Sequence, residues 1–333
     1  MRIATLCLMT LVACTAKDGP LDKSGGDTGV EPESDGPWTL VSDEVAGGVL
    51  LSAWSNGDDL HVVGGDLGGG PGVMLHGNAS QLCVEDSVTE RALWWIHGDQ
   101  SGRWVAVGEA GLVLTEVDGV RTRMDIPTEA TLFGVWMNEG FTWAAGGSVG
   151  AGQNSGEIWR HDGVEWEAIA TDLPHVLFKV WNNWFVGQDI AYFWNGEELE
   201  QYSIDGRLLT IRGISETDAW AVGGLVGALV LHFDGTDFKE VNTDGLGQAI
   251  NGVYTAPGED VWIGGNYGVT ARWNGVGWDQ PDLPLTSDHL HAVWRHNDAT
   301  WWFGGDLFSV GDNHGTIIRH SEDGLIPEIV DCE

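Results

Sequence analysis

A short apolar phrase ending in glycine returns seven times along this chain, at intervals of about forty residues. The first glycine of each copy is Gly64, Gly108, Gly146, Gly187, Gly223, Gly264 or Gly304. A fixed period of this length is typical of stacked supersecondary units, none of which can bury its own apolar faces alone. The repeat therefore constrains the architecture strongly, and it leaves the ligand open.

The third copy shows what one unit contains. Four runs rich in aromatic and β-branched residues occupy 133–136, 141–147, 157–161 and 164–170, which predicts four strands. Asp162 and Gly163 join the last two runs, and such a pair supplies the positive φ angles of a tight hairpin. Equivalent pairs begin at Asp118, Asn195, Asp234, Asn274 and Asp323. We therefore predict an all-β fold, a seven-bladed β-propeller of four-stranded antiparallel blades over residues 37–333.

Tryptophan is abundant, with 19 residues, and it recurs at the end of the first run of most units. The recurring positions are Trp54, Trp95, Trp136, Trp181 and Trp294, with Tyr254 in the sixth unit. Large rings at one position of nearly every unit favour packing between blades. A carbohydrate-binding platform is the alternative for such an aromatic stripe.

The unit read from 218–224 and 232–235 resembles the repeats of secreted bacterial β-propellers, intermediate between the kelch and Asp-box (BNR) types. The kelch pairing of Tyr and Trp is incomplete here, and Gly163 follows Asp162 directly, whereas an Asp-box places one residue between them. Sialidases of the Asp-box group also use an arginine cluster, but arginines are dispersed along this chain. The resemblance implies a propeller fold, a layout shared with photosystem assembly lipoproteins, and no particular activity.

The first residues have the pattern of an export signal. Arg2 precedes an apolar stretch at 3–12 that is too short to span a membrane. Residues 11–14 resemble a bacterial lipobox, which implies a signal peptide at 1–13 and lipidation of Cys14. An ordinary secretory signal is the alternative. Thr15 after the cysteine is typical of sorting to the outer membrane, facing the periplasm or the cell surface. Residues 14–36 are acidic and poor in apolar residues, which predicts a disordered linker.

The formal net charge is −35. Such an acidic chain cannot neutralise phosphates, so we expect no nucleic-acid partner and no membrane contact except through the lipid anchor. Solubility in a salty medium explains the charge. Capture of Ca²⁺ or of a cationic partner is the alternative.

Two cysteines remain after export and lipidation, Cys83 and Cys332. In an exported protein we expect them to form a disulfide, which would join the first and last units of a closed ring. Free buried thiols are the alternative. Residues 35–41 imitate the fourth strand of a unit and should pair with the last blade, where residues 325–330 compete for the outermost position. The order of these two segments stays open.

Three long loops after the glycine phrases, and the connection before the last unit, define a candidate ligand or metal face. Its residues are Asp66, Asp306, Asp312, His314, Asp288, His289 and His291. Carboxylates from two loops would suit Ca²⁺, and two histidines with a carboxylate would suit a transition metal, but no metal-binding motif is present. Solvated turn residues are the simpler interpretation. His76, His161, His232 and His320 recur in the third run and are interpreted as structural.

No catalytic residues can be assigned from these patterns. The leading hypothesis is a monomeric, lipid-anchored, non-catalytic module that binds an envelope protein or a glycan. The alternative is a propeller enzyme, of the glycoside hydrolase, lyase or lactonase kind, with Ca²⁺ as a possible cofactor. An assembly factor for an envelope complex is a third hypothesis. Carboxylates converging on the ring axis would favour the enzyme, and an axis lined by apolar and backbone groups would favour the binding module.

Overall fold

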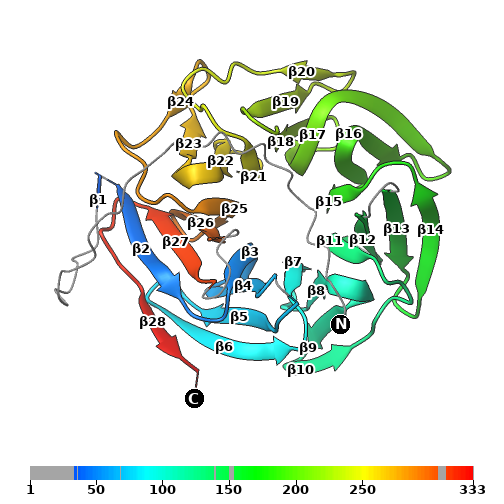
Figure 1. Ribbon diagram of the computed structural model, residues 1–333, viewed down its shortest axis with the longest axis horizontal. Helices are drawn as coiled ribbons and strands as arrows, with labels where there is room; N and C mark the ends of the chain where they lie inside the picture. Colours follow the sequence, from blue (N-terminus) through cyan, green and yellow to red (C-terminus); the bar gives the residue numbers. More distant parts are fainter. Residues whose placement is uncertain are drawn as a thin grey trace, which may run out of the picture.

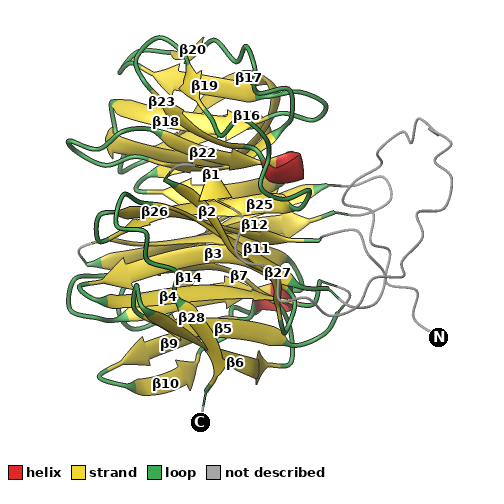
Figure 2. Ribbon diagram, turned by 90° about the vertical axis from the view of Figure 1, so that its left-hand side faces the viewer, coloured by secondary structure: helices red, strands yellow, loops and turns green. Residues whose placement is uncertain are grey.

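The computed structural model describes residues 34–35, 37–67, 69–138, 140–149, 154–306 and 313–332. Strands dominate these residues, with two short 3-10 turns, η1 (Glu109–Gly111) and η2 (Asn266–Gly268). The sheets are arranged around a common axis and form a ring, as Figure 1 shows, and Figure 2 shows the same ring from the side. The predicted all-β propeller with antiparallel blades is confirmed. The predicted signal peptide, Cys14 and the linker up to residue 33 lie outside the described residues.

Three sheets have the expected meander of four antiparallel strands. The Asp-Gly and Asn-Gly pairs lie in the turn between the last two strands of these sheets, as predicted. Both residues have a positive φ only at Asp118 and Gly119, and at Asp162–Gly163 and Asn274–Gly275 only the glycine does. The sheets comprise β7 (Leu93–Gly98), β8 (Trp104–Gly108), β9 (Val113–Val117) and β10 (Val120–Arg123); β11 (Thr131–Asn138), β12 (Phe141–Ser148), β13 (Ser155–His161) and β14 (Trp166–Leu173); and β21 (Ile250–Tyr254), β22 (Trp262–Gly265), β23 (Thr270–Trp273) and β24 (Trp278–Asp279).

The fourth and fifth sequence units share one six-stranded sheet. Its strands are β15 (Leu177–Trp181), β16 (Trp184–Trp194), β17 (Leu199–Ser215), β18 (Asp218–Gly223), β19 (Leu229–Phe233) and β20 (Phe238–Glu240). The described residues therefore form six sheets, which corrects the prediction of seven. The physical reason is β17, whose extended backbone continues without a break from its pairing with β16 to its pairing with β18.

The two chain ends meet where the ring closes. The first sheet contains β3 (Val49–Asn56), β4 (Asp59–Gly65), β5 (Gly72–Gly77) and β6 (Gln81–Thr89), and the last contains β25 (His289–His296), β26 (Ala299–Gly305) and β27 (Gly315–His320). The N-terminal β2 (Trp38–Val45) pairs with β27, followed outward by β1 (Ser34–Asp35), as expected for residues 35–41. The C-terminal β28 (Glu328–Asp331) pairs instead in parallel with β6. The order left open by the sequence is thus decided: the two ends bind different sheets.

In the four- and five-stranded sheets, a strand at one end of the strand order lies nearest the axis. In the six-stranded sheet, β15 and part of β17 lie there (Figure 1). We call β3, β7, β11, β15, β21, β25 and residues 208–215 of β17 the inner strands. Each inner strand has a register shift at its second or third paired residue, so that one residue is left out of the ladder. The glycine phrase lies opposite this bulge. A Cβ at Gly64 would lie 1.8 Å from the carbonyl oxygen of Val49, so only glycine fits there.

Most of the recurring aromatic residues are buried between sheets. Trp54, Trp181, Tyr254 and Trp294 are all buried, which favours the packing interpretation. The second strands add the fully buried Trp104, Trp143, Trp184, Trp262 and Trp301. In the second unit the register corrects the alignment: His97, not Trp95, is equivalent to Trp136, because His97 and Trp136 stand at the same place after the bulge.

Candidate functional site

The bulged residues of the inner strands gather around one level of the axis. We call this set the bulge tier: Leu51, Trp94, Phe133, Phe178, Leu209, Asn251 and His291. The ring of Phe133 contacts Trp94 at 4.8 Å and Phe178 at 5.6 Å between centroids. Equivalent side chains of successive strands can contact one another in this way if all of them turn toward the axis. A bulge produces that turn because it removes its residue from the alternation of the strand.

Several polar atoms on the bulge tier have no hydrogen-bond partner among the described residues. They are Nε1 of Trp94 and Nε2 of His291, and Nε of the neighbouring Arg207. The guanidinium carbon of Arg207 lies 5.9 Å from the centroid of the Phe178 ring. Asn251 differs, because its Nδ2 donates to Asn266 Oδ1 at 2.9 Å and to the carbonyl of Leu290 at 3.0 Å. The tier thus combines half-buried aromatic rings with unused polar groups.

Lys179 lies next to this tier and reaches from β15 past β11 to β7. It is buried, and its Nζ lies 3.2 Å from the centroid of the Trp95 ring and donates to the carbonyl of Phe133 at 3.2 Å. Burial lowers the pKa of Lys179 well below its usual value of 10.5. Among the described residues, no carboxylate counteracts this shift, which burial alone causes.

A second group of side chains follows three residues after the bulge tier. We call it the collar: Trp54, His97, Trp136, Trp181, Arg212, Tyr254 and Trp294. The Arg212 guanidinium lies 4.4 Å from the Trp294 ring, 5.0 Å from Tyr254 and 5.1 Å from Trp136. Burial lowers the pKa of Arg212 to about 10. Since these rings come from three different strands, Arg212 braces the ring across its axis.

His97 is the other ionisable member of the collar. It stacks on Trp136 with centroids 3.6 Å apart, and its Nδ1 accepts a hydrogen bond from the Met137 backbone at 3.0 Å. Burial lowers the pKa of His97 well below 6.5. The imidazole is therefore neutral, with its proton on Nε2.

The inner strands contain no aspartate or glutamate. For β17 this statement covers residues 208–215, which form its inner part. The ionisable groups that these strands bring to the axis are Lys179, Arg212, His97 and His291. A pair of carboxylates, which glycoside hydrolysis requires, is thus absent from these strands.

The predicted loop face is only partly assembled. Asp288 binds His314 (Oδ2 to Nε2, 3.2 Å) and accepts a hydrogen bond from Thr316. Asp66 accepts a hydrogen bond from Asn313 at 3.1 Å, which links the first and last sheets. His289 contacts Asn266 at 2.9 Å, and burial lowers its pKa while Asp288 and Asp306 oppose that shift.

Of the remaining predicted residues, His291 belongs to the bulge tier, and burial lowers its pKa to about 3. Asp306 directly follows β26, and Asp312 lies outside the described residues. Among the residues that the structure describes, metal-ligating side chains do not gather at this loop face in threes. Its histidines and carboxylates are joined to one another and to amides.

One further pattern has the spacing of a catalytic motif. Residues 146–150 read Gly-x-Ser-x-Gly, the arrangement around the nucleophile of some hydrolases. In those enzymes the serine occupies a sharp turn between a strand and a helix. Ser148 is instead an exposed residue at the end of β12, paired with Ser155. The motif is part of the glycine phrase and carries no nucleophile elbow.

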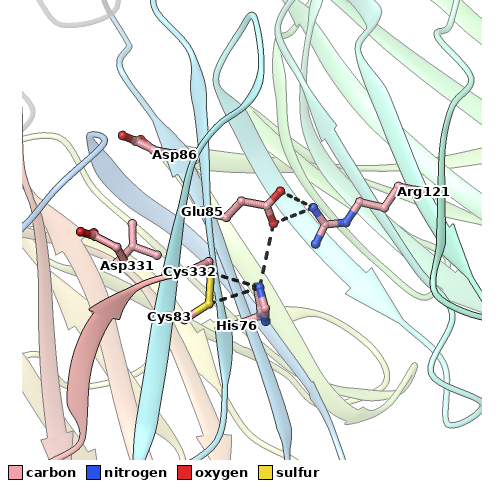
Figure 3. A pocket seen from close by; sticks show the side chains of 8 residues that line it. His76, Cys83, Glu85, Asp86, Arg121, Asp331 and Cys332 are labelled. Atoms are coloured by element: carbon pink, nitrogen blue, oxygen red, sulfur yellow. Dashed lines mark hydrogen bonds and ion pairs between the residues drawn. A yellow bond between two sulfur atoms is a disulfide. The ribbon is translucent and has the colours of Figure 1, made fainter.

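A surface pocket of about 720 Å³ lies at the rim, where β28 covers β6. Figure 3 shows its side chains: His76 from β5, Glu85 and Asp86 from β6, Arg121 from β10, and Asp331 near the C-terminus. Cys83 and Cys332 form a disulfide in its wall. Arg121 contacts Glu85 at 2.7 Å and Glu116 at 2.9 Å. We call this the seam pocket.

Sequence reasoning treated His76 as structural because it recurs with His161 and His232. The structure adds its neighbours, since both sulfur atoms of the disulfide lie beside its Nε2. The sequence contains only part of the pattern that would predict His76 beside both cysteines. Cys83 follows His76 by seven residues, but Cys332 reaches the pocket through the pairing of β28, which the sequence does not reveal.

No helix among the described residues is long and apolar enough to cross a membrane. No protein-family model matches the chain, and no curated protein matches it.

Several solved structures share the fold. One described as YCF48 bound to D1 peptide has a TM-score of 0.62 at 13% identity, covering 86% of this chain and 97% of the other. A streptogramin B lyase has a TM-score of 0.66 at 12% identity, covering 85% and 97%. YCF48 from Cyanidioschyzon merolae has a TM-score of 0.61 at 14% identity, covering 86% and 99%. At such low identity these similarities show a β-propeller and nothing finer.

Proposed function

We propose that this protein is a non-catalytic binding module that holds a segment of another protein at the bulge tier. The observation that carries the proposal is the set of unpartnered polar atoms beside half-buried aromatic rings, Trp94 Nε1 and Arg207 Nε next to Phe178. Buried donors without partners are costly, and a ligand that supplies acceptors removes that cost. A protein segment offers backbone carbonyls for the donors and apolar side chains for the rings.

The charge of the molecule restricts the kind of partner. A net charge of −35 repels acidic proteins and accelerates association with basic ones. Near the axis, however, the inner strands carry cations and no carboxylates. We therefore expect a partner with a basic surface that inserts a segment presenting carbonyl or carboxylate oxygens. That one structurally similar propeller holds a D1 peptide supports protein binding by this fold.

The test is crosslinking in the native cells followed by affinity measurement with the recovered partner. Trp94→Phe keeps the ring and removes the donor, so binding should weaken by about three- to tenfold, the value of one hydrogen bond. Trp278→Phe is the matched control, because its Nε1 donates to Asn242 in the outer part of the sheet and its loss should leave binding unchanged. Equal affinities for the wild type, Trp94→Phe and Arg207→Met would refute the proposal.

An enzyme is the second candidate, and similarity to a lyase in fold is the observation that favours it. Carboxylates of the inner strands cannot serve such chemistry, since there are none. The available bases near the axis are His97 and His291, whose pKa values are lowered by burial. Turnover of a glycan or lactone that His291→Asn abolishes would establish this candidate over the binding module.

We further propose that the module is a monomer tethered to the outer membrane through a lipidated Cys14, with residues 15–33 as the linker to the propeller. Support comes from the lipobox-like residues 11–14 and the acidic, apolar-poor composition that follows. Cys14→Ser should move the protein from the membrane fraction to the soluble fraction, and mass spectrometry should find diacylglycerol on the wild type alone. Unmodified Cys14 in membrane-bound protein would exclude the anchor.

Finally, we infer that the six-stranded sheet acts as two blades, which would give the ring seven. Support comes from a fold-back within β16 and a change of pairing partner within β17. Trp194 donates to the carbonyl of Asn183 at 2.9 Å, so β16 folds back on itself around Asp189, which has a φ of 59°. In β17 the partner changes from β16 to β18 between Arg207 and Leu208.

A further inference from the structure

We propose that the seam pocket becomes a zinc site when the Cys83–Cys332 disulfide is reduced, with the two thiolates and His76 as protein ligands. This inference is independent of the proposed binding function, because the pocket lies at the rim of the ring and not at its axis (Figures 1 and 3). Among the described residues, these three are the one set of metal-ligating side chains whose ligand atoms all lie within 4.8 Å of one another.

The distances already suit a tetrahedral ion. Nε2 of His76 lies 3.5 Å from Cys83 Sγ and 3.3 Å from Cys332 Sγ. Zinc bonds of about 2.3 Å to sulfur and about 2.0–2.1 Å to nitrogen place such ligand atoms about 3.6 Å apart. Only the two sulfur atoms must separate, to about 3.8 Å, and reduction itself breaks the bond that holds them together. The imidazole therefore needs almost no movement.

The surroundings favour a cation. Glu85, Asp86 and Asp331 line the same pocket, which opens to solvent, and Arg121 is neutralised by Glu85 and Glu116. Oε2 of Glu85 lies 3.9 Å from Nε2 of His76. Glu85 could thus become the fourth ligand by exchanging its bond with Arg121, and water would complete the shell otherwise. Two soft sulfur ligands with one imidazole select zinc over calcium or magnesium.

The chemistry balances with a thiol reductant. Two thiol molecules give two electrons and two protons to the disulfide, forming their own disulfide and the thiols of Cys83 and Cys332. Zinc binding then releases those two protons, because the metal takes thiolates. The consequence is mechanical. In either state Cys332 stays joined to Cys83, so β28 remains docked on β6 in oxidising and in reducing conditions.

The test compares the full chain in its oxidised and reduced forms. The protein is first reduced with a phosphine in the absence of oxygen. We then expect one bound Zn²⁺ per chain by native mass spectrometry. With Co²⁺ as probe we expect the thiolate charge-transfer absorption of a tetrahedral site. The oxidised protein should show neither. His76→Ala should weaken zinc binding by more than about tenfold. His232→Ala is the matched control and should bind zinc as the wild type does. His232 occupies the equivalent place in β19, because it pairs with Trp220 as His76 pairs with His61.

Circular dichroism on the same samples shows whether reduction disturbs the fold. The comparison of wild type with His76→Ala holds even if reduction disturbs the fold, because the thiols of an unfolded chain would bind zinc with or without His76. Equal zinc affinity of reduced wild type and reduced His76→Ala would overturn the proposal. So would a reduced protein that binds zinc no more tightly than the oxidised one.

Discussion

At the residue scale, the two buried cations near the axis have different surroundings. Arg212 lies among three aromatic rings, whereas Lys179 has one ring and one carbonyl. A desolvated ammonium group is costly, and its attraction to a ring offsets only part of that cost. Lys179 is therefore a residue whose charge lowers stability, held in place by the packing around it.

Lys179→Met tests this interpretation. Methionine fills similar space without charge, so the free energy of unfolding should rise by about 1 kcal/mol at neutral pH. The pKa of Lys179 is lowered in the folded state, so between that pKa and 10.5 the unfolded chain binds a proton that the folded chain does not. Wild-type stability therefore rises with pH in this window, and the advantage of the variant should shrink by about pH 9.5.

Urea unfolding of both proteins at the two pH values measures the effect. Lys239→Met is the control, because Lys239 is exposed and ion-paired with Asp234. A Lys179→Met protein less stable than the wild type at neutral pH would show that the contacts of the ammonium group outweigh its desolvation.

His61 predicts a loss of stability in acid. It is mostly buried against Trp54, and burial, with His76 nearby, lowers its pKa to about 4. Between pH 6.5 and about 4 the unfolded chain takes up a proton that the folded chain resists, so stability falls as pH falls. His61→Phe keeps a stacked ring and removes this term. Between pH 6.5 and 4.5, the free energy of unfolding should fall for both proteins, but by about 2 kcal/mol less for His61→Phe than for the wild type.

Chemical denaturation at those pH values measures the difference. His175→Phe is a control, since His175 is half-buried in the connection between β14 and β15. Parallel pH profiles for wild type and His61→Phe would show that acid sensitivity comes from other groups.

At the element scale, β17 shows how one glycine permits two pairings. Gly206 has a φ of 132°, a conformation that residues with a Cβ rarely adopt, and it stands just before the change of partner. The backbone can thus leave one ladder and join the next without a loop. The sequence predicts a boundary between two units here, and in the structure one continuous strand changes its partner at this point.

Gly206→Ala should lower the free energy of unfolding by about 1–2 kcal/mol, because alanine is strained at this φ. Gly227→Ala is the matched control: its Cβ would meet nothing within 4 Å and its φ is not in the positive region. Thermal unfolding followed by circular dichroism compares the two variants. Equal melting temperatures would show that the backbone at 206 relaxes freely.

At the scale of the whole molecule, the net charge of −35 opposes the closed ring. Screening shortens the range of this repulsion, to about 10 Å at 0.1 M ionic strength. The melting temperature should therefore rise as sodium chloride is added from low ionic strength. Calorimetry measures the rise, with salts of different cations at matched ionic strength as comparison. A rise with divalent cations alone would indicate specific binding instead of screening.

The repeat predicted much of the fold because its signals are local. Asp162 with Gly163 specifies a hairpin, and Gly64 specifies close approach to the inner strand, whatever the rest of the chain does. The site was less predictable. Trp94 and Phe178 reach the axis because a bulge redirects them, and the residues next to them in the sequence do not predict that bulge. Of the predicted loop residues, Asp288 and His314 are directly bonded to each other.

The sequence by itself determined the blade: its strands, its turns, the glycine at its narrow point and the aromatic residues between sheets. These depend on backbone propensities and on contacts between residues close in the chain, which a repeating pattern records. Only the tertiary structure decided where β28 pairs, how β17 joins two units, and which cations meet aromatic rings across the axis. The pairing of β28 and the contacts across the axis arise from closing the ring, which brings together residues separated by much of the chain and leaves no periodic signal. The path of β17 depends on one glycine, Gly206.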